Sequence, residues 1–493
     1  MATTDSASNA TAITKSATVT KVPVSLLDTD LYKLTMQNAV FKTFPDAHSE
    51  YKFTNRAPDM LFSRKCYEWV QEQVQALANL RLSAEERQYL EKHCPYFHAD
   101  YLDFVSALSL DPANQVRVTF IPHTEGDAEM DNSVRHAGEE REAKRRKTDD
   151  GNGSKADEMG LIEMDIQGPW RDCILYEVPL MSILSEGYFK FDDTDWEEDY
   201  EAVQERAKQK TFTLLTESAG NILFSEFGTR RRRSYMVHDA VIKGLIEGDK
   251  EWATTEDGKK ILAENGGKKS GGLAGTSNVF LAMQYGLRPV GTIAHEWIMA
   301  IGAKENYESP NIRAMEAWEK VYPATGASPL HTMLTDTYTI KTFFDEFTSE
   351  PERALRWNGL RHDSGDPIVF AQAVKDAWNT VAKSAGRDVK EVLKGKKVIF
   401  SDGLDVPESL RIWNECEKIG IDASFGIGTN LTNDFKKASD SSSQSKPLNI
   451  VIKLRRIDGL ECVKLTDDKG KYTGEPSEVR RVLKKLKGED LAG

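Results

Sequence analysis

His295, Glu296 and Trp297 stand one residue after a short apolar run, residues 289–293, whose composition is typical of a β-strand. A histidine beside a carboxylate at a strand end can act as a proton-transfer base, because its pKa lies near neutral pH. The alternative is a capped or core histidine that only packs against its neighbours. The other apolar runs of the chain distinguish these two interpretations.

Six further apolar runs, from residue 222 onward, also end in polar residues that could take part in catalysis. They are residues 222–227, 273–274, 332–334, 359–360, 398–400 and 423–425. Helix-length segments separate most of these runs. Repeated units of strand, polar end and helix indicate a parallel sheet. Seven ends with different polar residues favour a β/α barrel over an open sheet, and the active site of such barrels is built at the carboxyl ends of the strands.

Two of these ends are suited to anions. Gly426, Gly428 and Thr429 could form a phosphate cradle, because backbone N–H groups can approach an anion closely at glycine. The alternative is a tight turn that serves only the backbone. The run 230–233 consists of four arginines, whose planar guanidinium groups match phosphates and carboxylates. We expect one or two of them to face the site and the others to be structural.

Two other ends carry carboxylates. Asp363 and Asp402 lie beside small residues in RHDSGDP and SDGLD, where they could bind ribose hydroxyls or Mg²⁺. Helix capping is the alternative, and Asp366, which precedes a proline, fits a cap better. His238 has no partner motif, and we assign it a structural role.

Length and composition limit the class of protein. The chain has 493 residues, enough for two or three domains. Its formal net charge of −13 argues against partners such as nucleic acid or a membrane surface, because both are polyanions. No apolar run approaches the roughly 18 residues that cross a bilayer. Five scattered cysteines favour a reducing compartment, and we expect a cytoplasmic protein.

Changes in composition suggest four parts of the chain. Residues 1–23 read as a disordered tail, and residues 24–180 as an N-terminal α/β domain that includes a disordered insertion at about 124–157. Residues 181–447 would form the irregular β/α barrel with the active site. Residues 448–493 would pack back on the first domain. The basic run 144–147 could direct the protein to the nucleus as well, or simply be solvated charge.

The polar ends together resemble a known family. The motifs are SLLDTDLYKLTM, YKFTNR, EFGTRRRRS, GTSNVFLA, GTIAHEW, LTDTY, RHDSGDP, SDGLD and SFGIGTNLTNDF, in this order between about residues 25 and 454. They look like those of nicotinate phosphoribosyltransferase, in its eukaryotic, fungal-like branch. The resemblance implies a type II phosphoribosyltransferase fold, an α/β architecture in which an N-terminal domain joins an irregular β/α barrel.

The resemblance also implies a reaction and its small-molecule partners. Nicotinate and phosphoribosyl pyrophosphate would give nicotinate mononucleotide and pyrophosphate, coupled to hydrolysis of ATP, in the first step of NAD salvage from nicotinate. Mg²⁺ would be the cofactor and ATP a co-substrate. The family contains monomers and homodimers, so the oligomeric state stays open. The pyridine nitrogen is already a nucleophile, which explains the lack of a catalytic base.

Five residues receive roles around the base and the phosphoryl group. His295 would be the histidine that ATP phosphorylates, and we expect Glu296 to orient its ring. Phe227 would stack on one face of the pyridine ring and Tyr32 on the other, in dimeric relatives from the neighbouring subunit. Ser277 would lie near the nicotinate carboxylate, where the related nicotinamide enzymes have an aspartate.

Other residues would surround the sugar and its phosphates. The side chains that would face phosphate, pyrophosphate or carboxylate groups are Arg56, Arg230 and Arg361. The carboxylates that would lie around the ribose are Asp336, Asp363 and Asp402, of which Asp363 and Asp402 would also serve catalysis and hold Mg²⁺. The residues that would surround the 5′-phosphate are Gly403, Gly426, Gly428 and Thr429.

Three other functions compete with this one. Nicotinamide phosphoribosyltransferase has the same fold, but Ser277 in place of an aspartate argues against it. An inactive regulatory relative is disfavoured by the polar groups at all seven ends. A phosphosugar aldolase-type barrel would need a Schiff-base lysine at a strand end, and none of the seven ends supplies one.

Overall fold

The computed structural model describes residues 21–123, 158–267, 269–324, 330–467 and 472–488. Three segments of the sequence analysis lie outside these ranges. They are the expected insertion at 124–157, the basic run 144–147 within it, and nearly all of the expected tail. Among the described residues, no helix is long and apolar enough to cross a bilayer.

The first domain is built on an antiparallel sheet of order β14-β13-β1-β4-β2, with β3 paired to β4. Its strands are β1 (His48–Asn55), β2 (Phe62–Ser63), β3 (Val116–Pro122), β4 (Met159–Pro169), β13 (Ile450–Ile457) and β14 (Leu460–Glu461). Strand β13 pairs with β1 along its length, so a segment near the C-terminus completes the N-terminal sheet. Buried and exposed residues alternate along β4, as expected for a strand with one face on the core.

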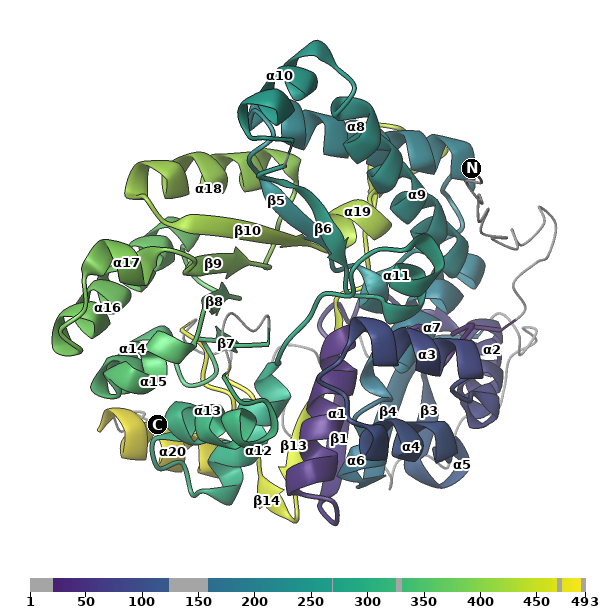
Figure 1. Cartoon of the computed structure of the whole chain (residues 1–493). Coiled ribbons are helices and arrows are strands. Elements are labelled where there is room, and N and C mark those ends of the chain that lie inside the picture. Colours follow the sequence, from purple (N-terminus) through teal and green to yellow (C-terminus); the bar gives the residue numbers. More distant parts are fainter. Residues whose placement is uncertain (1–20, 124–157, 268, 325–329, 468–471, 489–493) are drawn as a thin grey trace, which may run out of the picture.

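Helices of this domain surround the sheet. They are α1 (Leu31–Thr43), α2 (Arg64–Ala76), α3 (Ala84–His93), α4 (Ala99–Ala107), α5 (Pro112–Gln115), α6 (Trp170–Cys173) and α7 (Glu177–Phe191). Ser83 and Glu86 form a capping box that begins α3. Every residue of α1 from Leu31 to Val40 is buried, because this helix runs between the first sheet and the barrel (Figure 1).

The second sheet contains six parallel strands in the order β6-β5-β10-β9-β8-β7. They are β5 (Leu223–Glu226), β6 (Gly272–Thr276), β7 (Thr332–Leu334), β8 (Gly359–His362), β9 (Lys397–Phe400) and β10 (Asp422–Ile427). Each corresponds to one of the apolar runs that the sequence predicts to be strands. Figure 1 shows the strands in an arc, with helices such as α16 and α18 on its outer side.

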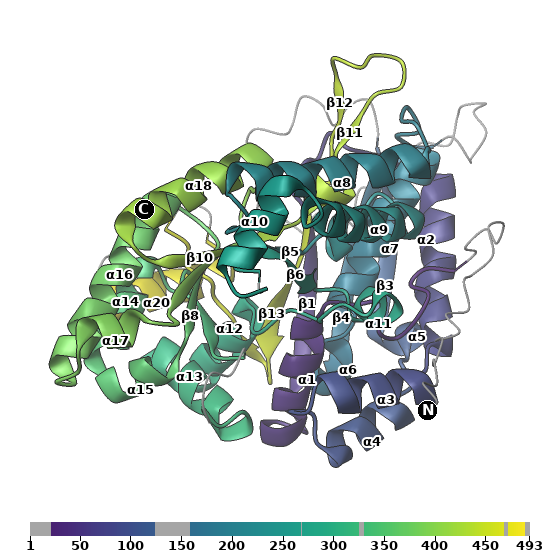
Figure 2. The same cartoon turned by 45° about the horizontal axis from the view of Figure 1, so that its top comes forward.

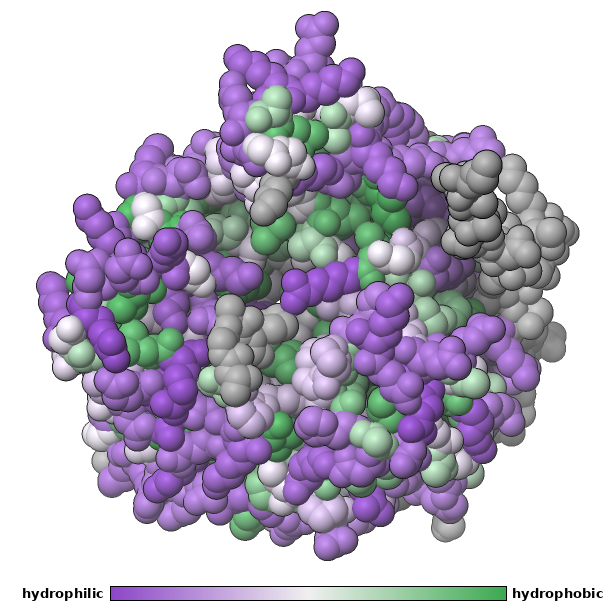
Figure 3. All heavy atoms as spheres, in the orientation of Figure 1, coloured by the Kyte–Doolittle hydropathy of each residue, from purple (hydrophilic) through white to green (hydrophobic). Residues whose placement is uncertain are grey.

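Helices connect these strands. They are α8 (Tyr200–Glu217), α9 (Tyr235–Trp252), α10 (Glu256–Glu264), α11 (Val279–Tyr285), α12 (His295–Lys304), α13 (Pro310–Val321), α14 (Ile340–Ser349), α15 (Pro351–Arg356), α16 (Pro367–Ser384), α17 (Val389–Leu393), α18 (Val406–Ile419), α19 (Thr429–Thr432) and α20 (Pro476–Lys487). A small hairpin of β11 (Phe435–Lys436) and β12 (Gln444–Ser445) projects from the barrel (Figure 2). Hydrophilic residues cover most of the face shown in Figure 3.

The prediction of a seventh strand, at residues 289–293, is wrong. Residues 289–293 make only one β-bridge, between Pro289 and Thr276, and Val290 N–H donates to Thr276 O at 2.9 Å. Pro289 has no N–H with which to extend the pairing. The segment passes along the end of β6 and leads into α12, so His295 is the first residue of a helix and not a strand end. This irregular segment follows the edge of the six-stranded sheet.

Candidate active site

A cavity of about 400 Å³ lies at the carboxyl ends of the barrel strands and also reaches β13 of the first sheet. Ten predicted site residues line it, namely Tyr32, Arg56, Phe227, Arg230, His295, Arg361, Asp363, Asp402, Gly428 and Thr429. A second cavity of about 370 Å³ shares Asp402, Gly428 and Thr429 with the first and is also lined by Gly403. Together the two cavities form one polar space around the strand ends.

The ring of His295 is held at both nitrogens. Nδ1 lies 3.0 Å from Thr337 Oγ1, and Nε2 lies 3.1 Å from Asp363 Oδ2. The ammonium of Lys464 lies 2.9 Å from Nε2. Burial lowers the pKa of His295, and the positive charge of Lys464 lowers it further. The imidazole is therefore neutral near pH 7, and one of its two ring nitrogens carries no proton.

Lys464 is a site residue that the sequence analysis missed. Its Nζ also lies 2.9 Å from Asp336 Oδ2, so the lysine bridges Asp336 and His295. Asp336 is fully buried, and its pKa is lowered because His295 and Lys464 outweigh the effect of burial. It also accepts a hydrogen bond from Ser364 Oγ at 3.0 Å. No motif marks Lys464, which follows β14 far from the barrel segments in sequence.

The expected role of Glu296 is wrong. Its carboxylate accepts from Trp170 Nε1 at 2.8 Å and from the Tyr51 hydroxyl, and it pairs with Lys33. These partners engage the carboxylate of Glu296, and among the described residues it makes no hydrogen bond to His295. Thr337 and Asp363 orient the imidazole instead.

The aromatic end of the cavity is formed within one chain. Tyr32 and Phe227 both line it, and the Arg230 guanidinium lies 6.0 Å from the centre of the Tyr32 ring. Phe227 packs so closely on Gly426 that a Cβ on this glycine would lie 2.3 Å from the phenylalanine Cδ2. Gly426 therefore supports the Phe227 ring and is not one of the residues that line either cavity.

Ser277 is buried beside this aromatic end. Its hydroxyl donates to Asp30 Oδ1 at 2.7 Å, and its backbone carbonyl accepts from Leu31 N–H at 2.8 Å. These bonds attach the start of α1, which carries Tyr32, to the end of β6. In this arrangement Ser277 does not line the cavity, and its hydroxyl is engaged by Asp30.

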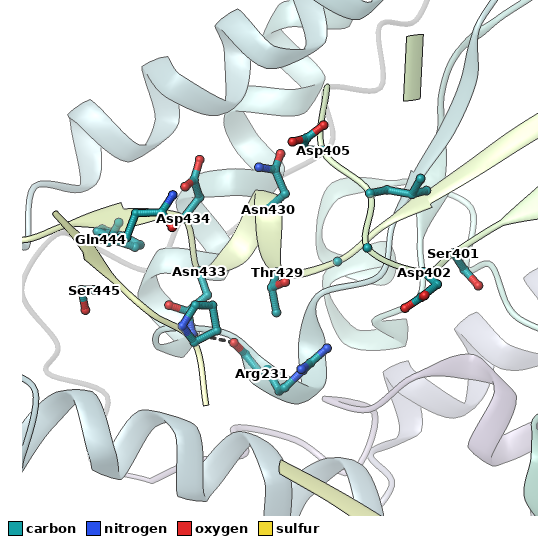
Figure 4. Close-up of a pocket in the computed structure, with 15 residues that line it drawn as sticks. Arg231, Ser401, Asp402, Asp405, Thr429, Asn430, Asn433, Asp434, Gln444 and Ser445 are labelled. Carbon is teal, nitrogen blue, oxygen red and sulfur yellow. Dashed lines mark hydrogen bonds between the residues drawn. The ribbon is translucent and has the colours of Figure 1, made fainter. Parts of the chain in front are cut away.

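The opposite end of the space is suited to phosphate (Figure 4). Arg231, Asp402 and Thr429 surround the second cavity, together with the backbone of Gly403 and Gly428. Burial lowers the pKa of Arg231 to about 10, and the charges of Arg230 and Arg56 add to this effect. Among the described residues no carboxylate forms an ion pair with Arg231. Its guanidinium is therefore available to an anion.

The two other arginines of the run 230–233 are structural. Arg232 makes a bidentate pair with Asp28, and both side chains are fully buried. Arg233 donates to Ser445 and lies 3.7 Å from the centre of the Phe189 ring.

Six cationic and four acidic side chains line the cavity, so its lining carries a net positive charge although the whole protein is acidic. The cations that line it are Arg56, Arg230, Arg231, Arg361, Lys453 and Lys464. Burial lowers the pKa of Lys453 to about 8, with a smaller effect from the charge of Lys464. Such a concentration of positive charge attracts polyanionic ligands.

The carboxylates offer two places for a metal ion. Ligand atoms of His295, Asp336 and Asp363 lie within 4.8 Å of one another, but the ammonium of Lys464 already contacts His295 and Asp336. Asp402 lines both cavities, and its pKa is raised by burial and by the negative charge of Asp363. Since no described cation pairs with Asp402, this side of the cavity fits Mg²⁺ better.

Comparison with known proteins shows the family to which this chain is similar. The model of the nicotinate phosphoribosyltransferase (NAPRTase) family matches residues 222–489, and the model of its N-terminal domain matches residues 27–131. Nicotinate phosphoribosyltransferase of Saccharomyces cerevisiae is 36% identical over 94% of this chain and 94% of that protein.

Solved structures agree with these sequence matches. A crystal structure from Saccharomyces cerevisiae has a TM-score of 0.76 at 35% identity and covers 94% of this chain and 98% of that chain. The structure of nicotinate phosphoribosyltransferase from Porphyromonas gingivalis has a TM-score of 0.71 at 33% identity and covers 94% and 99%. Over nearly its whole length, in sequence and in fold, this chain belongs to the nicotinate phosphoribosyltransferase family.

Proposed function

We propose that this protein converts nicotinate, phosphoribosyl pyrophosphate, ATP and water into nicotinate mononucleotide, pyrophosphate, ADP and phosphate. The observation that carries the proposal is the position of a neutral His295 in a cationic cavity that also has an aromatic end. One end can hold a planar anionic base and the other a sugar phosphate. This reaction is the first step in the salvage of nicotinate into NAD.

The glycosyl transfer needs positioning and charge stabilisation more than acid–base chemistry. The pyridine nitrogen attacks C1 of the ribose, and the bond from C1 to the pyrophosphate oxygen breaks. Positive charge then grows on the ribose and negative charge on the leaving group. Arg361 and the other guanidinium groups of the cavity stabilise the leaving group. Asp363 and Asp402 are the nearest carboxylates that can stabilise the ribose.

The base would bind between Tyr32 and Phe227, with its carboxylate toward Arg230. Offset stacking on two aromatic rings favours a flat heterocycle. The Arg230 side chain lines the cavity and is 40% exposed, so its guanidinium can exchange solvent for a carboxylate. The neutral amide of nicotinamide gains less from this guanidinium, which favours nicotinate as the substrate.

His295 would be the phosphoryl acceptor. A neutral ring nitrogen attacks the γ-phosphorus of ATP, the new N–P bond forms, and the bond to the ADP oxygen breaks. The phosphoryl group adds about −1.5 to −2 charges. Lys464 lies beside Nε2, and His295 occupies the first turn of α12, where the helix dipole favours negative charge. Water later cleaves the N–P bond and releases phosphate.

Asp402 and Asp363 are the residues that would hold Mg²⁺. When bound, the ion supplies charge compensation to the pyrophosphate oxygens. The raised pKa of Asp402 reflects the energetic cost of ionising a buried carboxylate that has no paired cation and lies near the negative charge of Asp363. A divalent cation would remove this cost.

The decisive experiment compares two bases. Purified protein is incubated with phosphoribosyl pyrophosphate, ATP and either nicotinate or nicotinamide, and both mononucleotides are quantified by chromatography. We expect efficient formation of nicotinate mononucleotide and a much lower rate with nicotinamide. A preference for the amide would refute the proposed substrate, and inactivity with both bases would refute the proposed reaction.

A further inference from the structure

Lys33 is a buried lysine of α1 whose ammonium lies between two carboxylates. Nζ donates to Glu296 Oε2 at 2.6 Å and forms a second ion pair with Glu177. None of its side chain is exposed. Burial disfavours its charge, but Glu177 and Glu296 outweigh this effect and raise the pKa of Lys33. The residue therefore stays charged, although the mechanism above does not use it.

Glu177 connects this lysine to the cavity. It is the first residue of α7, lines the cavity beside Tyr32, and has a side chain that is 12% exposed. Its Oε1 accepts a hydrogen bond from Arg230 Nη1 at 3.3 Å. The same carboxylate is thus shared between Lys33 and the arginine that we assign to the carboxylate of the substrate.

Glu296 fixes the ammonium from the other side. Trp170 Nε1 donates to it at 2.8 Å, and the Tyr51 hydroxyl is a second donor. These contacts hold Glu296 in place, and Glu296 in turn keeps Lys33 beside Glu177. Because Glu296 follows His295 in α12, Lys33 joins the base end of the cavity to the helix of the proposed phosphoryl acceptor.

The charges of this group are balanced only when the lysine is present. Lys33 and Arg230 together neutralise Glu177 and Glu296. Without Lys33 the group would be negative, Arg230 would be the remaining cation beside Glu177, and an incoming carboxylate would meet repulsion at short range. A neutral base would not meet this repulsion.

We propose that Lys33 is a positioning residue that sets the preference for an anionic base, because it shares Glu177 with Arg230 and so weakens the hold of Glu177 on the arginine that would bind the substrate carboxylate. This inference rests on the proposed function. It extends that function by naming a residue outside the cavity as a determinant of specificity.

The test measures KM and kcat for nicotinate and nicotinamide in Lys33→Met. The KM for nicotinate should rise about tenfold with a smaller change in kcat, and the preference for nicotinate over nicotinamide should fall. The double variant Lys33→Met/Glu177→Gln leaves Glu296 and Arg230 as one negative and one positive charge, so the group is again neutral and the nicotinate KM should be restored. A purely structural role of Lys33 predicts no such rescue.

Glu177→Gln alone is an independent test of the proposal. It can be used even if Lys33→Met does not fold. This variant keeps the pair of Lys33 with Glu296 and frees Arg230 from its competitor, so the KM for nicotinate should fall. Lys42→Met is the matched control, because Lys42 lies on the same helix and pairs with Asp100 at the surface. It should change neither KM.

An unchanged nicotinate KM in Glu177→Gln, or equal losses for both bases in Lys33→Met without rescue by the double variant, would overturn the inference. A wild-type protein that does not use nicotinate at all would instead overturn the proposed function. The two failures are therefore distinguishable.

Discussion

His295 Nε2 lies 2.9 Å from Lys464 Nζ, although 169 positions separate the two residues in the chain. The segment that carries Lys464 also binds the loop after β7, where Leu465 N–H donates to Thr337 O at 2.7 Å. Thr337 in turn contacts His295 Nδ1. The segment after β14 therefore affects both ring nitrogens, one directly and one through Thr337.

The phosphoryl acceptor can be identified by labelling. Incubation with ATP labelled at the γ-phosphate should leave acid-labile phosphate on the wild-type protein, and His295→Asn should lose it because the amide has no comparable nucleophilic nitrogen. His98→Asn, at an exposed position before α4, serves as the control and should keep the label. Retention of the label in His295→Asn would contradict the role that we assign.

Removal of the Lys464 charge should change the pH dependence. Lys464 lowers the pKa of His295, second in effect to burial, so Lys464→Met should raise that pKa. Phosphorylation needs the neutral ring, and the acidic limb of the phosphorylation rate should therefore move to higher pH. The rate near pH 7 should also fall, by about 10- to 100-fold, because the phosphoryl charge loses its nearest cation.

Lys464→Arg is the matched variant for this prediction. It retains the positive charge, and its acidic limb should stay close to that of the wild-type protein. The rate of label incorporation between pH 5 and 9 measures both effects. An acidic limb that does not move in Lys464→Met would show that the lysine does not control the ionisation of His295.

Substitution of two neighbouring arginines should have different effects, on substrate binding for Arg231 and on stability for Arg232. Arg231→Met should raise the KM for phosphoribosyl pyrophosphate about 10- to 100-fold with little change in stability, because it removes a charge-assisted contact to phosphate worth ~1.5–3 kcal/mol. Arg232→Met should instead lower the free energy of unfolding by ~3–5 kcal/mol, since Asp28 would remain buried without its partner.

Initial rates and thermal unfolding of both arginine variants are the measurements. A stable Arg232→Met protein, or an unfolded Arg231→Met protein, would contradict the division of the arginine run into binding and structural members.

Two glycines of β10 and its end should affect different substrates. A methyl group at Gly426 would displace the Phe227 ring, so Gly426→Ala should raise the KM for nicotinate by roughly tenfold through lost stacking. At Gly428 the nearest atom to an added Cβ is Phe227 O at 3.4 Å, an ordinary contact, and the methyl group would face the phosphate end. Gly428→Ala should therefore raise the KM for phosphoribosyl pyrophosphate. Steady-state kinetics with each substrate varied in turn measures both effects. The prediction is contradicted if Gly426→Ala raises the KM for phosphoribosyl pyrophosphate and Gly428→Ala that for nicotinate.

Local features of the fold could be predicted because their causes are local. Six runs of two to six apolar or small residues correspond to the parallel strands β5 to β10, since each is bounded by polar residues and followed by a helix-forming segment. Ser83 begins α3 because a serine three residues before Glu86 can form the capping box by itself.

The predictions that were wrong depended on distant partners. Residues 289–293 have the composition of a strand, but among the described residues the segment forms a single β-bridge, to Thr276 at the end of β6. Glu296 is adjacent to His295 in sequence, yet Lys33, Tyr51 and Trp170 hold its carboxylate away from the ring.

The candidate chemistry of this protein could be predicted from the amino-acid sequence, because the types of the histidine, carboxylates, arginines and glycines do not depend on their final contacts. Which of these residues share a cavity depends on the packing of the folded chain. Arg230 and Arg231 line it whereas Arg232 pairs with Asp28, and Lys464 reaches His295 from a segment without a motif. The physical reason is that residue type and helix or strand preference are local properties, whereas ion pairs and burial depend on packing between segments far apart in the chain.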